Sequence, residues 1–580
     1  TGLIQSPGAT SGYGVYISAS TFGGGITNTG TISGGYTALY VSYVHLGGGI
    51  TNTGTIVSSN SEGLNFYESS AAGGITNTGY IAGSSGIDLS YSSLAGGITN
   101  TGTILAGATS GDYHGINVYS SVLDGGITNT GTIVAGYAGI HVSSSTLSGG
   151  ITNTGYINAT SEYAGVYVSG ASLGGGITNT GTILGNSSYG ALYVYSATLG
   201  GGITNTGLIE AVTGTGVYIS YSSLAGGLLN TGTIHGTTYG VYIYSSSLSG
   251  GLTNTGLIKS DSEYAIYLSS STLAGGITNT GTLTSKYTGL YVTDSTLGGG
   301  VTNTGLVAAS NGEGITLSTS TFGGGILNTG TISGANTALY INSVSAAGGI
   351  TNTGLIHSQA NEGIYIYSSS FAGGLTNTGT IDAHSSYGIY MSSVTLGGGI
   401  VNTGTINAHD YYGVYATGVT ATGGITNTGL IDAQNGDTGL YLYEVSFGGG
   451  ITNTGTILSG SSGIYVYSGT FGGGLTNTGL IDGGTDAGVY LDATTFAGDL
   501  VNTGTILAES YGIHVTSSSF AGGITNSGYI KSTGSTALYI TGSTFGGGLT
   551  NTGTIIGYSS GISITNVTFG GGLTNTGLID

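Results

Sequence analysis

Histidine and aspartate side chains recur at matching positions in the second half of the chain, where they could bind a metal ion. His384 and His409 each lie seven residues after a repeated asparagine, and Asp382 and Asp432 each lie five residues after one, as does His357. Imidazole nitrogens and carboxylate oxygens are both ligands for transition metals. A solvated polar patch on a variable loop explains the same residues, and we favour it. The sequence therefore predicts no metal site and no cofactor.

The chain also lacks the residue types that catalytic and nucleic-acid-binding sites need. It has no Cys and no Arg, and its three lysines, Lys259, Lys286 and Lys531, lie far apart. A nucleophilic Ser or Thr needs a neighbouring base, and phosphate binding needs clustered Lys and Arg. The net charge is −20, and no apolar run reaches the roughly 18–20 residues of a membrane span. We therefore expect no enzyme, no nucleic-acid partner and no membrane span.

Threonines form a second pattern with a chemical meaning. Thr27 and Thr29, repeated along the chain, make a Thr-x-Thr array with spacings of roughly 7 Å along a strand and 4.8 Å between strands. Such arrays resemble those of ice-binding β-solenoids. Leu229 and Val401 interrupt the first column, so ice binding is the third of three functional hypotheses.

All of these residues lie in repeats that share the motif Gly-Ile-Thr-Asn-Thr-Gly-x-Ile, whose asparagine occurs 23 times at a mean spacing of about 25 residues. An aliphatic residue stands two before and four after each Asn, and a Gly stands two after it. Length varies only between the end of this motif and the next Tyr-centred segment, and the longest insertion lies near residues 105–114. Each repeat therefore has a constant part and one variable loop.

The motif alternates with the period of a β-strand, so that Ile26, Asn28 and Ile32 share one face. A Tyr-centred segment alternates in the same way, a third short segment follows, and Gly-rich corners separate them. The sequence therefore predicts an all-β fold, a parallel β-solenoid of 23 coils with three short strands per coil. We expect residues 1–580 to form one continuous array without internal boundary or caps, since stacking is what buries the apolar face of each repeat.

Stacked coils place equivalent residues in ladders. The asparagines, of which Asn28, Asn52 and Asn77 are the first three, either occupy left-handed corners, which Asn tolerates, or point inward as an amide ladder. The interpretation is structural in both cases. The sequence also predicts an apolar ladder, whose first members are Phe22 and Leu46. It further predicts an exposed, stacked aromatic ladder, whose first members are Tyr16 and Tyr40. The tyrosine ladder is also the surface that we associate with sugar binding or filament packing.

The motif Gly-Gly-Ile-Thr-Asn-Thr-Gly-Thr-Ile, followed by a segment like Gly-Val-Tyr-Ile, resembles the repetitive passenger regions of bacterial autotransporter-type surface proteins. The resemblance covers essentially the whole chain. It implies a right-handed β-helix on the cell surface of a Gram-negative bacterium. The calcium-binding nonapeptide Gly-Gly-x-Gly-x-Asp is not present, because the Gly-rich corner is followed by Ile-Thr-Asn-Thr.

The array starts at Thr1-Gly2-Leu3-Ile4 and stops at Asp580 in the same phase of the repeat, without a polar cap. An uncapped coil leaves a sheet edge that pairs with another, so we expect a segment of a longer array or a subunit that assembles with identical chains, end to end or laterally. The sequence thus predicts a structural protein of a bacterial extracellular filament, fibre or surface layer. The alternative is an adhesin stalk or passenger that displays a binding tip, with surface glycans as partners.

Overall fold

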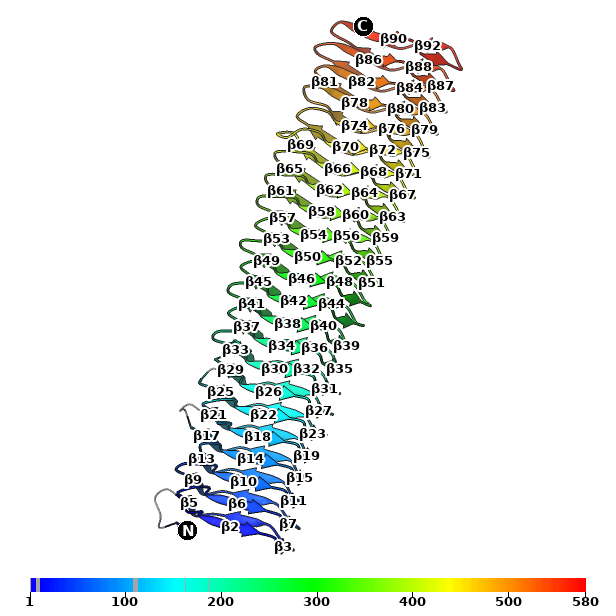
Figure 1. Cartoon of the computed structure of the whole chain (residues 1–580). Helices are drawn as coiled ribbons and strands as arrows, with labels where there is room; N and C mark the ends of the chain where they lie inside the picture. The colour runs from blue at the N-terminus through cyan, green and yellow to red at the C-terminus, as the bar shows by residue number, and fades with distance from the viewer. Residues whose placement is uncertain (1, 7–10, 108–112, 162, 187) are drawn as a thin grey trace. The chain divides into compact units, whose positions relative to one another are not determined.

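The computed structural model describes residues 2–6, 11–107, 113–161, 163–186 and 188–580. The chain divides into two units, Thr1–Lys286 and Tyr287–Asp580. The first unit contains strands β1 (Leu3–Gln5) to β45 (Thr282–Ser285), and the second contains β46 (Leu290–Thr293) to β93 (Leu578–Ile579) (Figure 1). Both units are parallel β-solenoids with about 23 coils in all, so the predicted fold class is confirmed. That the array is uninterrupted from end to end stays a prediction.

Each coil contains four short strands. In the first unit, one coil consists of β6 (Leu39–Ser42), β7 (His45–Leu46), β8 (Ile50–Asn52) and β9 (Thr55–Ser58). Each strand pairs in parallel with its equivalent one coil later, so that Leu39 lies opposite Leu64 and Asn52 opposite Asn77. The four strands of successive coils therefore build four parallel sheets, which we call the first to fourth sheets in the order of the strands within a coil.

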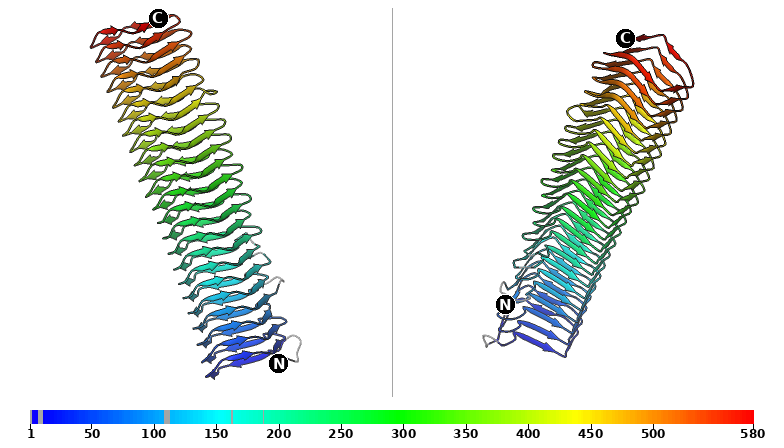
Figure 2. Two further views of the ribbon diagram at one scale, coloured as in Figure 1. Left: turned by 180° about the vertical axis from the view of Figure 1, so that it is seen from behind. Right: turned by 45° about the horizontal axis from the view of Figure 1, so that its top comes forward.

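The second unit repeats this arrangement. One of its coils consists of β58 (Ile364–Tyr367), β59 (Ser370–Phe371), β60 (Leu375–Asn377) and β61 (Thr380–Ala383). Its strands pair in register with β62 (Ile389–Ser392) and the three strands that follow. Figure 2 shows in both views that, within each unit, equivalent strands of neighbouring coils lie side by side.

The number of strands differs from the expectation of three because the motif bends. The segment Ile26–Ile32, expected as one strand, is divided into β4 (Ile26–Asn28) and β5 (Thr31–Gly34), with a bend at Thr29 and Gly30. The predicted inward face is nevertheless correct, since Asn28 and Ile32 are buried and Thr29 is exposed. The bend was not visible in the pattern because two bend residues between the strands preserve the alternation.

The interior is filled by apolar ladders. Along one coil, Leu39, Val41, Leu46 and Ile56 have no exposed surface. Phe22 pairs in register with Leu46, as predicted, although Phe22 itself remains 39% exposed. Phenylalanine occupies the same row at six successive coils of the second unit, from Phe447 onward, with ring centroids 4.5 to 5.7 Å apart and nearly parallel planes. Since each coil covers the next, no coil has a complete core of its own.

The asparagines form an amide ladder inside the solenoid, which is one of the two alternatives that the sequence left open. Nδ2 of Asn52 donates to Oδ1 of Asn77 at 2.8 Å, and Nδ2 of Asn28 donates to Oδ1 of Asn52 at the same distance. Each Nδ2 also donates to the carbonyl oxygen of the bend glycine two residues later, as Asn52 does to Gly54. The side chain thus satisfies carbonyl groups that the bend leaves inside the coil. No ladder asparagine among the described residues has a positive φ, so the alternative of left-handed corners is wrong.

The left-handed corner lies elsewhere, between the first and second strands of each coil. Among the described residues, twenty non-glycine residues there have φ between 42° and 56°, for example Tyr43, Glu68 and Ser368. Glycine takes the position in three coils, at Gly170, Gly418 and Gly542. For an L-residue this conformation costs about 1–2 kcal/mol relative to a right-handed one. It recurs because the corner must turn the chain between two sheets in every coil.

The variable loop lies where the sequence placed it, between the fourth strand of one coil and the first strand of the next. It shrinks to residues 509–510 between β81 (Thr505–Ala508) and β82 (Tyr511–Thr516). The longest insertion predicted, near residues 105–114, includes residues 108–112, which lie outside the described residues. In the described part of the chain we find no helix that is long and apolar enough to cross a membrane.

Candidate functional site

The histidine and aspartate row singled out in the sequence lies on the outer face of the fourth sheet of the second unit. His357 on β57 (Leu355–Ser358) pairs in register with Asp382 on β61, which pairs with Asn407 on β65 (Thr405–Ala408). Nδ1 of His357 lies 2.9 Å from Oδ2 of Asp382, and Nδ2 of Asn407 donates to Oδ1 of Asp382 at 2.8 Å. Asp382 is therefore the centre of the cluster.

Two of the other predicted residues join this cluster and one does not. Nε2 of His409 lies 3.4 Å from Oδ1 of Asp382, and the ring of His384 lies 4.9 Å from that of His409 at a tilt of 54°. Oδ1 of Asp432 instead accepts a hydrogen bond from the backbone of Gln434 in its own loop. Among the described residues, no group of three or more His, Cys, Asp or Glu side chains could hold a metal ion. The arrangement is a hydrogen-bonded patch on the outer face of the solenoid.

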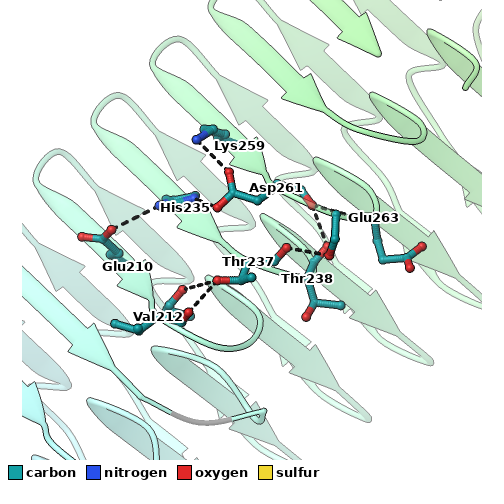
Figure 3. A network of polar contacts seen from close by, with 11 residues as sticks. Glu210, Val212, His235, Thr237, Thr238, Lys259, Asp261 and Glu263 are labelled. Atoms are coloured by element: carbon teal, nitrogen blue, oxygen red, sulfur yellow. Dashed lines mark hydrogen bonds and ion pairs between the residues drawn. The ribbon is translucent and has the colours of Figure 1, made fainter. Parts of the chain in front are cut away.

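A second polar network, in the first unit, was missed from the sequence. Figure 3 shows Glu210, His235, Lys259 and Asp261 linked across three successive coils. Nδ1 of His235 lies 3.2 Å from Oε1 of Glu210, its Nε2 lies 2.8 Å from Oδ2 of Asp261, and Nζ of Lys259 lies 2.7 Å from Oδ1 of Asp261. Partial burial acts to raise the pKa of Asp261, but hydrogen bonds from Lys259 and His235 outweigh it and lower that pKa.

The signal for this network was present in the repeat. Glu210, His235 and Lys259 all lie five residues after a ladder asparagine, the position also held by His357 and Asp382. The register confirms that Glu210 lies opposite His235, and His235 opposite Lys259. A search along that single position, for any charged residue and not only for histidine, would have found both networks.

The tyrosine ladder covers the outer face of the first sheet, as predicted. Tyr16 and Tyr40 stack at 5.3 Å with their planes 6° apart. In the second unit, the ladder from Tyr340 to Tyr490 has centroid spacings of 4.8 to 5.2 Å and angles of 1° to 5°. Tyr16 is 56% exposed, but most later members are half-buried by their neighbours. The tyrosine column therefore covers the outer face of the first sheet, and its stacked rings shield one another from solvent.

Polar residues interrupt this column between Tyr40 and Tyr167. We call them the polar window: Asn65, Asp88, Asn117 and His141, which lie opposite one another in register on β10 (Leu64–Tyr67), β14 (Ile87–Ser90), β18 (Ile116–Tyr119) and β22 (Ile140–Ser143). Nδ2 of Asn117 donates to Oδ2 of Asp88 at 2.9 Å, and Nδ1 of His141 lies 2.7 Å from Oδ1 of Asn117. Burial raises the pKa of Asp88, although hydrogen bonds from Asn117 and Ser90 oppose the effect.

His114 packs beside this window and is only 6% exposed. Its ring stacks on that of His141 at 4.4 Å with an angle of 10°, and meets the edge of Tyr137 at 5.1 Å. Nδ1 of His114 has no hydrogen-bond partner within the part of the chain that the structure describes. Burial, and to a smaller extent the neighbouring His141, lower the pKa of His114 to about 3.

The chain should therefore lose stability below neutral pH through His114. In the unfolded chain this histidine has a pKa of about 6.5. Between about pH 6.5 and pH 3, the unfolded state therefore binds the proton and the folded state does not. Each pH unit of decrease in that window lowers the free energy of unfolding by up to about 1.4 kcal/mol. Ala138 and Ala164 hold the equivalent position in the next two coils, so His114→Ala should fold and should flatten this dependence. The measurement is the urea midpoint at pH 7.5 and at pH 5.

The matched control is His384→Ala, which changes an exposed histidine of the second unit. It should retain the steeper loss of stability shown by the unsubstituted chain. Parallel pH profiles for the unsubstituted chain and His114→Ala would contradict the assignment to His114.

The two threonine columns do not lie on one flat strand. Thr51 belongs to β8, whereas Thr53 lies in the bend that follows, with Oγ1 3.4 Å from the carbonyl oxygen of Asn28. Thr53 is exposed and Thr51 is half-buried. Because the bend separates the two columns, this geometry does not favour ice binding.

Comparisons with known proteins do not extend this description. No family model, no curated protein and no solved structure matches the chain. The resemblance to autotransporter-type passenger regions therefore rests on the repeat pattern, and what is established is a repetitive parallel β-solenoid with polar clusters along its outer face.

Proposed function

We propose that this chain is a structural protein of a bacterial extracellular fibre or surface layer, with no enzymatic activity. The observation that carries the proposal is the asparagine ladder, which repeats with the same hydrogen bonds from coil to coil within each unit. In the second unit it runs from Asn303 to Asn575, and neighbouring amides are 2.8 or 2.9 Å apart throughout. Such uniformity fits a protein whose coils all have the same task.

Durability supports the same function. In repeat proteins each added unit contributes its own interface with its neighbours, and here each interface adds four parallel strand pairs, apolar ladders and the amide ladder. The chain has only three lysines and no arginine, so proteases that cut after basic residues have few sites. These properties suit a protein that is exposed outside the cell.

Assembly with identical chains is part of the proposal. The tyrosine column of the first sheet offers a long, weakly charged face for lateral packing, because aromatic side chains bury large areas on association. The other mode is end-to-end pairing of coils, in which backbone groups of one chain continue the sheets of the next. Lateral packing would depend on the tyrosine column, whereas end-to-end pairing would not.

Negative-stain electron microscopy of the purified chain tests the proposal. We expect unbranched filaments of constant width that are many times longer than a single chain. Discrete particles at all concentrations would contradict it and would favour the adhesin stalk, in which the solenoid carries a binding tip.

A paired variant separates lateral from end-to-end assembly. Asp88 already stands in the tyrosine column, so Tyr365→Asp with Tyr415→Asp should be compatible with the fold. If chains pack laterally, these charges should thin the filaments or dissolve them, whereas end-to-end filaments should keep their width and length.

A further inference from the structure

A groove runs along the left-handed corner of the first unit, between the first and second sheets. The stretch between residues 19 and 122 has a volume of about 800 Å³. Its lining includes Tyr43, Glu68 and Tyr91, which are left-handed corner residues of three successive coils. Elsewhere in the chain serine is the commonest residue at this corner. The backbone therefore makes the groove, and the corner residues decide its chemistry.

Two exposed tyrosine rings, those of Tyr43 and Tyr91, line one wall of this stretch. Tyr67 and Tyr119 support them from outside the lining: Tyr43, Tyr67, Tyr91 and Tyr119 meet edge to face in succession, with centroids 6.0, 5.8 and 5.4 Å apart. Tyr43 is 57% and Tyr91 51% exposed. The row consists of corner residues alternating with the residues just before the corner, so that each ring supports the next while leaving surface open to a ligand.

Polar groups complete the wall. Hydrogen bonding to Glu68 is the main cause that raises the pKa of Tyr67 to about 12, and the charge of Glu68 likewise raises the pKa of Tyr43. Both phenols keep their protons at neutral pH and donate them to the carboxylate of Glu68, which holds the two rings in place. The phenol oxygens can still accept a hydrogen bond from a ligand hydroxyl.

The second strands form the opposite wall, with a column of outward-facing hydroxyl groups. Thr21, Ser70 and Ser93 line the groove together with His45. Nδ1 of His45 lies 2.8 Å from Oγ of Ser70. Thr21, Ser70 and Ser93 place hydroxyl groups in three of the groove's five coils, whereas His45 and Val122 hold the same register position in the other two. Neighbouring coils lie at the strand spacing of about 4.8 Å.

We propose that this stretch binds an extended, neutral polysaccharide whose chain runs along the stacked coils. A sugar ring has an apolar face, which can pack on a tyrosine ring. It also has hydroxyl groups, which can form hydrogen bonds with Ser, Thr and carboxylate side chains. The two walls of the groove offer both kinds of partner. The coil spacing is close to the length of one sugar unit, so successive units can meet successive coils. An anionic polymer is disfavoured, because Glu68 lines the groove and the chain carries a net charge of −20. The proposal does not depend on the chain forming fibres.

The chain supplies its own control. In the second unit the equivalent groove has a volume of about 420 Å³ and is lined by Ser, Thr and Val side chains, with Ser343, Ser368 and Ser393 at the left-handed corners. It has the same backbone but no aromatic or charged lining residue. Tyr43→Ser with Tyr91→Ser converts the first groove toward the second, using a residue that this corner already accepts.

The test is affinity electrophoresis of the full chain in native gels that contain xylan, hydroxyethylcellulose, mannan or dextran, with alginate as the anionic polymer. We expect retardation by at least one neutral polymer. The double Tyr→Ser variant should bind that polymer at least about tenfold more weakly, as loss of buried aromatic contacts typically does. Its circular dichroism and thermal midpoint should stay close to those of the unsubstituted chain.

Tyr365→Ser with Tyr415→Ser removes two tyrosines outside the groove and should leave the retardation unchanged. The proposal is overturned if no neutral polymer retards the chain, if alginate alone retards it, or if the two double variants weaken binding equally.

Discussion

Replacing Asn402 by Leu is expected to lower the free energy of unfolding by about 4 kcal/mol, because several buried polar groups lose their partners and each costs about 1–3 kcal/mol. Oδ1 of Asn402 accepts a hydrogen bond from Asn377, and its Nδ2 donates to Oδ1 of Asn427 and to the carbonyl oxygens of Gly404 and Leu430. Leucine has a similar size but makes none of these bonds. Urea denaturation followed by circular dichroism measures the change.

The matched control is Asn336→Ala, which removes an asparagine on the variable loop whose Nδ2 makes a 3.4 Å contact with the carbonyl oxygen of Asn311. It should change the free energy of unfolding by less than about 0.5 kcal/mol, as surface substitutions usually do. Equal effects of the two substitutions would mean that the ladder contributes no net stability.

Asn402→Asp distinguishes hydrogen bonding from shape. At neutral pH a carboxylate in this position can only accept, so it would face Oδ1 of Asn427 without a proton between them. It should destabilise the chain at least as much as Leu does. Stability relative to the unsubstituted chain should recover as the pH falls, because burial raises the carboxyl pKa and the protonated acid can donate to Asn427. A pH-independent defect would contradict this account.

The constant part of the repeat was predictable because the positions that repeat in the sequence are the positions that are buried in the fold. The buried positions Asn28, Ile32 and Leu46 repeat at fixed distances, and stacking converts fixed distances into ladders. The inward amide ladder was one of two alternatives, and the choice needed the backbone: a left-handed corner would have placed the side chain of Asn28 differently, and only the folded chain shows that Asn28 reaches Asn52.

The corners were harder to predict. Glycine marks left-handed turns in most sequences, but in this chain Ser, Tyr and Glu adopt that conformation at Ser368, Tyr43 and Glu68. Their residue types carry no signal for the turn, so the groove beside it could not be foreseen. The polar window was visible only as a gap in the tyrosine column, and its hydrogen-bonded chain from Asp88 through Asn117 to His141 depends on side-chain directions that the pattern does not contain.

The bend glycines are constrained by the preceding coil and not by their own φ. A Cβ atom added to Gly131 would lie 2.1 Å from the carbonyl oxygen of Gly102 and 2.6 Å from the carbonyl carbon of Thr101, both of which are backbone atoms of the preceding coil. Gly131 does not have a positive φ, so a Cβ is excluded by contact alone. The same close approach recurs at the bend glycine of coil after coil, which explains why the repeat never departs from glycine two residues after the asparagine.

Gly131→Ala is therefore expected to lower the free energy of unfolding by about 3–5 kcal/mol, since relieving the clash must separate two coils and weaken the hydrogen bonds between them. Those bonds include the amide groups of Thr130 and Thr132, which donate to Asn100 and Gly102 at 2.8 and 2.9 Å. The control is Gly107→Ala, where the nearest atoms to the new Cβ lie 3.8 Å away and the change should stay within about 1 kcal/mol. Urea denaturation of both variants measures the difference. If Gly131→Ala were tolerated as well as Gly107→Ala, the coils would be able to move apart at little cost, and tight stacking could not be what makes the solenoid durable.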